Sequence, residues 1–122
     1  MKKLFAILVA TVAVALCMVS CQKTFDPSKG LNGTTWVATQ VAQTSSENIT
    51  VTYTLSFQET TFKLNTSYTY DGQAHSENQT GTYTLNGYTV TLQVDQMTEV
   101  GTISGSKMTF EGENENLVFT MK

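Results

Sequence analysis

The chain has 122 residues and a formal net charge of -3 at pH 7, with 10 acidic side chains, seven lysines and no arginine. A chain of this length is expected to form one domain that buries an apolar core. The composition argues against nucleic-acid binding and against docking on an anionic membrane, because both depend on clustered lysine and arginine.

Residues 1–20 predict a signal peptide for export. Lys2 and Lys3 form a positive start, an almost unbroken apolar run extends from Leu4 to Val19, and the small residue Ser20 follows. A retained transmembrane anchor is the alternative, because a membrane-spanning helix needs about 20 apolar residues.

The segment Met18-Val19-Ser20-Cys21 resembles the lipobox of bacterial lipoproteins, in which a lipidated cysteine becomes the new N-terminus. The resemblance implies that Cys21 attaches the protein to a membrane, and Gln22 after it implies the outer membrane, on its periplasmic or cell-surface face. Several acyl chains on one cysteine anchor a protein firmly, since each buried methylene contributes about 0.8 kcal/mol. The alternative is an unmodified Cys21 that pairs with Cys17 in a chain that keeps its leader.

A short tether is predicted between the lipid and the domain. Residues 21–30 contain the only proline of the chain, Pro27, and show no apolar periodicity. The folded domain is therefore expected to cover residues 31–122.

Alternating apolar and polar residues predict strands from Trp36 onward. The first strand is Trp36 to Gln43, and the second runs from Ile49 to Phe57 with threonines between its apolar residues. A third, Phe62 to Tyr70, ends at Asp71-Gly72, which is a hairpin signal. The polar residues 73–79 fit either the start of the next strand or an exposed loop.

The clearest hairpin is expected over Thr80 to Val94. Its two alternating runs meet at Asn86-Gly87, and this pair favours a type I′ turn because both residues tolerate positive φ. Three more short strands follow, over Val100 to Ser104, around Met108 and Phe110, and from Leu117 to Met121.

About eight short strands joined by short loops predict an all-β fold. Consecutive hairpins pair antiparallel, and closing the sheet into an up-and-down β-barrel removes the sticky edge strands. An immunoglobulin-like sandwich is the alternative, but it favours longer crossing connections and a cysteine pair around a tryptophan.

Several motifs resemble those of lipocalin-like domains. Leu31-Asn32-Gly33-Thr34-Thr35-Trp36 resembles the glycine and tryptophan entry of these domains, and the runs GTYTLNGYTVTL, TISGSKMTF and LVFTMK resemble later strands of the small lipocalin-like lipoproteins of Bacteroidetes. The resemblance covers residues 31–122 and implies an up-and-down barrel on a lipid anchor. The chain lacks the arginine that packs on the tryptophan of true lipocalins, so their retinoid-type and haem-type ligands are not expected.

Aromatic side chains are the predicted ligand-binding residues. Several tyrosines share strand parity with aliphatic neighbours, so they are expected to face the barrel interior, where lipocalins bind ligands. The alternative is that these side chains simply fill the barrel, which eight strands make just wide enough for packing or for one small ligand. The predicted ligand-binding residues are Trp36, Tyr53, Tyr68, Tyr83 and Tyr88.

No catalytic or metal-binding arrangement is expected, and neither is a cofactor. His75 is the only histidine and has no legible partner, so a solvated loop residue is the simpler interpretation. Calcium could use the acidic residues Glu111, Glu113 and Glu115, but their spacing matches no EF-hand loop.

The sequence therefore predicts a non-enzymatic, monomeric, lipid-anchored protein that binds a small apolar or amphipathic molecule in its barrel. The alternative function is a cell-surface protein whose threonine-rich exterior or rim loops contact a glycan or a partner protein.

Overall fold

The structure, a computed structural model, describes residues 24–43, 48–112 and 116–122. The predicted signal peptide, Cys21, and the acidic residues Glu113 and Glu115 lie outside the described residues. Within the described part, no helix is both long and apolar enough to cross a membrane.

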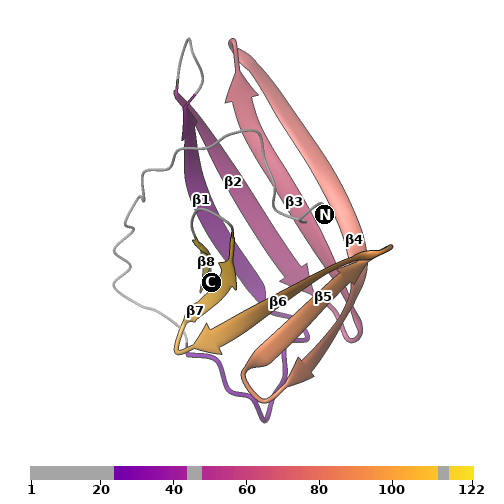
Figure 1. The fold of residues 1–122 in the computed structure, drawn as a ribbon. Coiled ribbons are helices and arrows are strands. Elements are labelled where there is room, and N and C mark those ends of the chain that lie inside the picture. The colour runs from indigo at the N-terminus through magenta and orange to yellow at the C-terminus, as the bar shows by residue number, and fades with distance from the viewer. Residues whose placement is uncertain (1–23, 44–47, 113–115) are drawn as a thin grey trace.

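Eight antiparallel strands form one closed barrel in which each strand pairs with the next and β8 pairs with β1 (Figure 1). This arrangement confirms the predicted up-and-down barrel in place of the sandwich. The strands are β1 (Thr35–Gln43), β2 (Asn48–Phe57), β3 (Thr61–Tyr70), β4 (Gln73–Asn86), β5 (Thr89–Val94), β6 (Met97–Ser104), β7 (Lys107–Glu111) and β8 (Asn116–Met121).

Strand alternation separates an apolar interior from a threonine-rich exterior. In β2, Ile49, Val51 and Tyr53 are buried, whereas Thr50 and Thr52 lie on the outer face. Successive side chains of a strand point to opposite faces, so the alternating sequence directly produces this division.

Two-residue turns connect most of the neighbouring strands. Asp71 and Gly72 both have positive φ, of 53° and 77°, as a type I′ turn requires. The turn between β4 and β5 differs from the prediction, because Asn86 still pairs with Thr89 and the turn residues are Gly87 and Tyr88. Only Gly87 has positive φ there, at 63°, which is the pattern of a type II′ turn.

The polar residues 73–79 belong to a strand rather than to a loop. They begin β4, which pairs with β3 over residues 73–82 and with β5 only over Thr82–Asn86.

Gly81 lies where β4 moves from one neighbour to the other, opposite Phe62 of β3. A β-carbon on Gly81 would lie 2.8 Å from the Phe62 ring and would also meet the backbone oxygen of Gln93. Only glycine therefore allows the close approach of β4 and β5 at this point.

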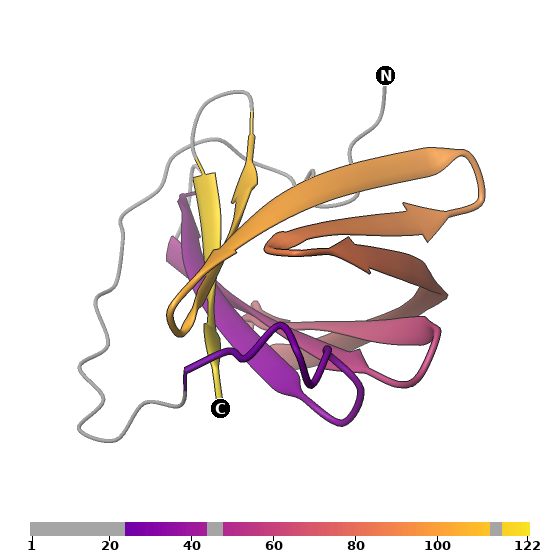
Figure 2. The ribbon, with the colours of Figure 1, turned by 90° about the horizontal axis from the view of Figure 1, so that it is seen from below.

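The core lies between the strands and continues into the segment before β1. Phe25 and Leu31 are buried, although Phe25 falls in the predicted tether, and the backbone N–H of Phe25 donates to the carbonyl of Gly105 at 2.9 Å. Figure 2 looks at this end of the barrel and shows residues 24–34, in indigo, in front of the strands. The other fully buried large side chains are Trp36, Tyr53, Leu55, Phe57, Phe62, Leu64, Val90, Leu92, Met108, Phe110 and Phe119.

Candidate ligand-binding site

Trp36 is completely buried at the end of the barrel where β1 begins. Its Nε1 donates a hydrogen bond of 2.9 Å to Oγ1 of Thr34, and its ring lies 6.3 Å from that of Phe25. The only polar atom of this side chain thus has a partner inside the fold. A ligand-binding role of Trp36 stays a prediction.

Tyr53 is also packed into the core, with 1% of its surface exposed. Its hydroxyl donates to Oε1 of Gln40 at 3.2 Å, and its ring is tilted against Phe119 at a centroid distance of 6.3 Å. Burial raises the pKa of Tyr53 well above its ordinary value near 10, because the phenolate would lose its hydration. Tyr53 therefore stays neutral at physiological pH.

Tyr83 joins β4 to the turn between β2 and β3. Its hydroxyl donates to the carbonyl oxygen of Gln58 at 2.7 Å, and its ring meets Phe57 edge to face at 4.8 Å. Partial burial raises the pKa of Tyr83, and the negative charge of Glu59 raises it further. The side chain therefore links a strand to a turn.

The remaining two predicted residues lie apart from each other. Tyr88 is 51% exposed because it is the second residue of the β4–β5 turn, so the prediction that it faces inward from a strand is wrong. Its ring contacts Phe25, whereas Tyr68 stacks on His75 at 5.0 Å near the β3–β4 turn. The structure therefore does not gather the predicted aromatic residues around one cavity.

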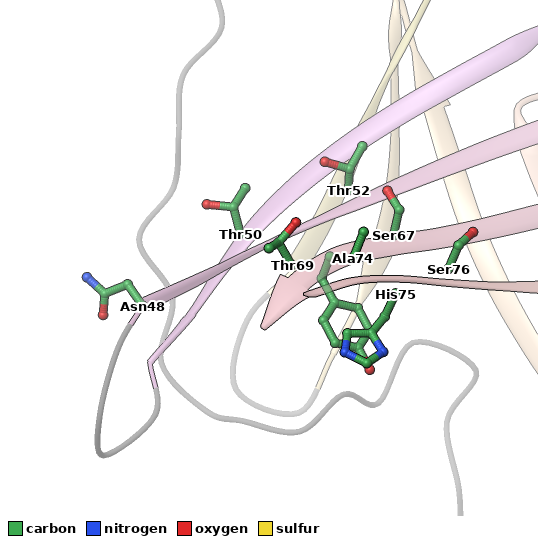
Figure 3. Close-up of a pocket in the computed structure, with 9 residues that line it drawn as sticks. Asn48, Thr50, Thr52, Ser67, Thr69, Ala74, His75 and Ser76 are labelled. Carbon is green, nitrogen blue, oxygen red and sulfur yellow. The ribbon is translucent and has the colours of Figure 1, made fainter. Parts of the chain in front are cut away.

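A hollow of about 600 Å³ lies instead on the outer face of β2, β3 and β4. Figure 3 shows its hydroxyl side chains pointing to one side of the strands and His75 to the other. Strand pairing sets Thr52 beside Ser67 and Ser67 beside Ser76, so three strands supply one continuous row of hydroxyls. The lining residues are Asn48, Thr50, Thr52, Ser67, Tyr68, Thr69, Ala74, His75 and Ser76.

Asn65 orders one side of this hollow. Its Nδ2 donates to Oγ of Ser76 at 3.0 Å and to Oδ1 of Asn78 at 2.8 Å. These bonds hold Ser76 in place while its hydroxyl hydrogen stays available as a donor. Closely spaced hydroxyls that both donate and accept suit a small hydroxylated ligand better than an apolar one.

The described residues include no group of side chains with the composition of a metal site. No three histidine, cysteine or acidic side chains there come close enough to hold a metal ion.

Glu99, which the sequence reasoning missed, is buried and faces the interior from β6. Glu99 lies four residues before the buried Ile103 and therefore on the same face of the strand. This spacing could have identified it, but the predicted strand began at Val100.

Comparison with protein families gives a match over most of the domain. The sequence model of the lipocalin-like domain matches residues 15–110, which is most of the chain. The protein belongs to the lipocalin-like domain family. Neither the curated proteins nor the solved structures gave a match. The lipocalin-like fold is that of a ligand-binding type of protein, and this family membership agrees with the barrel derived above.

Proposed function

We propose that this lipocalin-like protein is secreted, anchored to the bacterial outer membrane through a lipid on Cys21, and binds a glycan or another small hydroxylated molecule at the outer hollow of β2–β4. It acts by binding, without catalysis. The observation that carries the proposal is the continuous row of hydroxyl side chains across three paired strands.

The packing of the interior favours the exterior as the binding surface. Large side chains such as Phe57, Phe62 and Phe119 are at most 1% exposed, and the polar atoms of Trp36 and Tyr83 already bond within the fold. An apolar ligand at this level of the barrel would have to displace these packed rings. A ligand on the outer face displaces only water.

The lipid anchor rests on the apolar leader and on the position of Cys21 after Ser20. Replacing Cys21 by alanine in the full chain should move the protein from the membrane fraction to the soluble fraction of its host. Cys17→Ala is the matched control and should stay membrane-bound. Equal membrane fractionation of the two variants would contradict lipidation at Cys21.

The ligand proposal is tested by binding of the full-length protein, in detergent, to an array of bacterial glycans. Thr52→Val removes one hydroxyl of the hollow with almost no change of shape and should weaken binding about tenfold, which corresponds to roughly 1.4 kcal/mol. Thr91→Val, on the outer face of β5, is the control and should bind like the parent.

Two results would contradict the hydroxylated ligand. One is the absence of any bound glycan, and the other is equal weakening by Thr52→Val and Thr91→Val. Native mass spectrometry of the same protein tests the alternative, which is an apolar ligand inside the barrel. An apolar adduct that persists in Thr52→Val would place the ligand inside the barrel.

A further inference from the structure

One edge of β4 has no partner strand among the described residues. β3 pairs with one edge of residues 73–81, and β5 reaches only Thr82–Asn86 on the other. Figure 1 shows this part of β4 extending beyond β5 and β6. Residues 73–78 are exposed on both faces of the strand, so neither the core nor another strand covers them.

The register identifies the backbone groups at this open edge. Tyr70 and Gln73 flank a two-residue turn, so they form a hydrogen-bonded pair, and every second residue of β4 after Gln73 bonds to β3 in the same way. The intervening residues turn their N–H and C=O groups to the open edge. These residues are Ala74, Ser76, Asn78 and Thr80.

This edge lacks three of the common devices that prevent strand addition. Edge strands are commonly blocked by lysine, proline or a bulge. Residues 73–81 contain neither lysine nor proline, and they pair with β3 without a bulge. An edge of this length and chemistry is a template for another strand.

We propose that a second copy of this chain pairs antiparallel with the open edge of β4, with the two-fold axis at Ser76. Ser76 then pairs with Ser76 of the second copy, and Ala74 pairs with its Asn78, so that the edge groups of both copies are hydrogen-bonded. This goes beyond ligand binding and replaces the expected monomer with a dimer.

The side chains of β4 favour this register over the two neighbouring registers that also match the edge groups. With the axis at Ser76, His75 lies opposite Glu77 of the second copy, and this pair forms twice. Shifting one copy by two residues loses the His75–Glu77 pairs, because it places Glu77 opposite Glu77 or His75 opposite His75. Two carboxylates opposite each other are unfavourable. Opposite residues at these positions form non-hydrogen-bonded pairs, whose side chains come closest.

Cysteine cross-linking tests the register in the full-length protein in its host membranes. Ser76→Cys should give a covalent dimer on mild oxidation, because hydrogen-bonded partners lie about 5.5 Å apart between their Cα atoms, within disulfide range. Ala74→Cys is the matched control and should stay monomeric, since its equivalent in the second copy lies four residues, or about 13 Å, along the strand. The unchanged parent chain is a second control, because any cross-linking through Cys17 or Cys21 would also occur in it.

The inference is overturned if Ser76→Cys gives no more dimer than Ala74→Cys or the parent. It is likewise overturned if Asn78→Cys cross-links in place of Ser76→Cys, because the axis would then lie elsewhere.

A second comparison tests the pairing without cross-linking. Ser76→Pro removes an N–H that points to the open edge and leaves the β3 ladder intact, so it should abolish the dimer in analytical ultracentrifugation. Ser76→Ala loses the same side-chain bond to Asn65 but keeps its N–H, so it should remain dimeric. Dimers of equal strength in both variants would contradict pairing at this edge.

Charge reversal tests the His75–Glu77 contact separately. Glu77→Lys should weaken the dimer, and exchanging the two residues, by His75→Glu together with Glu77→His, should restore it. Failure of the exchange to restore dimerisation would contradict the proposed register.

Discussion

At the residue scale, the buried and partly buried aromatic side chains have their polar atoms satisfied by nearby groups. Trp36 bonds to Thr34, Tyr53 to Gln40 and Tyr83 to Gln58. A buried polar group without a hydrogen-bond partner destabilises the fold by more than one hydrogen bond stabilises it. These contacts therefore let the large rings fill the barrel without leaving a polar atom unpaired. The rings therefore act as core residues that also hold neighbouring segments in position.

The hydroxyl of Tyr83 should make a measurable contribution to stability. Tyr83→Phe removes the 2.7 Å bond to Gln58 and should lower the free energy of unfolding by about 1 kcal/mol, as read from urea denaturation. Tyr88→Phe is the control and should change it little, because Tyr88 is exposed in a turn. Equal effects of the two changes would show that the Gln58 bond does not stabilise the fold.

Tyr53 should make stability depend on pH in the alkaline range. The folded protein holds the Tyr53 proton to higher pH than the unfolded chain does, because burial raises its pKa above the ordinary value near 10. Tyr53 therefore does not change the free energy of unfolding with pH below pH 10. Above pH 10 the free energy of unfolding falls, by up to about 1.4 kcal/mol per pH unit. Tyr53→Phe should flatten the fall in unfolding free energy between pH 10 and 11, and an unchanged slope would contradict this assignment.

At the element scale, alternation in the sequence predicts all eight strands, with differences mainly at their ends. The strand signal is strong where threonine alternates with buried residues, as in β2. It fails in the first part of β4, because residues 73–79 are polar on both faces and are held by pairing with β3 rather than by burial. The turn at Gly87 was shifted by one residue because local preference for Asn-Gly was outweighed by the β4–β5 register.

Gly81 should be intolerant of any side chain. Gly81→Ala would place a β-carbon against the Gln93 carbonyl and 2.8 Å from both Phe62 and Val94, so β4 and β5 would have to separate. We expect a loss of about 1–3 kcal/mol in chemical denaturation. Thr80→Ala, on the exposed neighbouring position, should cost less than about 1 kcal/mol, and a similar loss in both variants would argue against the close approach.

At the scale of the whole molecule, the barrel closes through a short seam, and the segment before β1 extends its core. β1 and β8 share only two residue pairs, whereas β1 and β2 share nine. Phe25 and Leu31 pack on the end of the core next to Trp36. The segment before β1 therefore forms part of the folded domain.

The outer hollow could be predicted from the sequence only in part. Alternating threonines indicate a polar outer face, and a threonine-rich exterior that contacts glycan was one of the two expected functions. Which residues meet depends on the pairing of Thr52 with Ser67 and of Ser67 with Ser76. That register joins residues far apart in the chain, and no local pattern reports it.

Phe25 should be needed for full stability of the barrel. Phe25→Ala removes a ring that is 4% exposed and contacts both Trp36 and Tyr88, so we expect a loss of about 3 kcal/mol in chemical denaturation. Phe25→Leu keeps most of the apolar volume and should lose less. A loss below about 1 kcal/mol for Phe25→Ala would show that the segment adds little to the fold.

The position of Phe25 also sets how the molecule would stand on a membrane. Phe25 is the fourth residue after Cys21, and an extended chain over these four steps reaches about 14 Å at most. A lipid on Cys21 would keep the Phe25 end of the barrel close to the bilayer surface. The Asp71-Gly72 tip of the β3–β4 hairpin lies at the opposite end of a ten-residue strand, about 33 Å away. The hydroxyl-lined hollow and the open edge of β4 would then face outward, where large molecules can reach them.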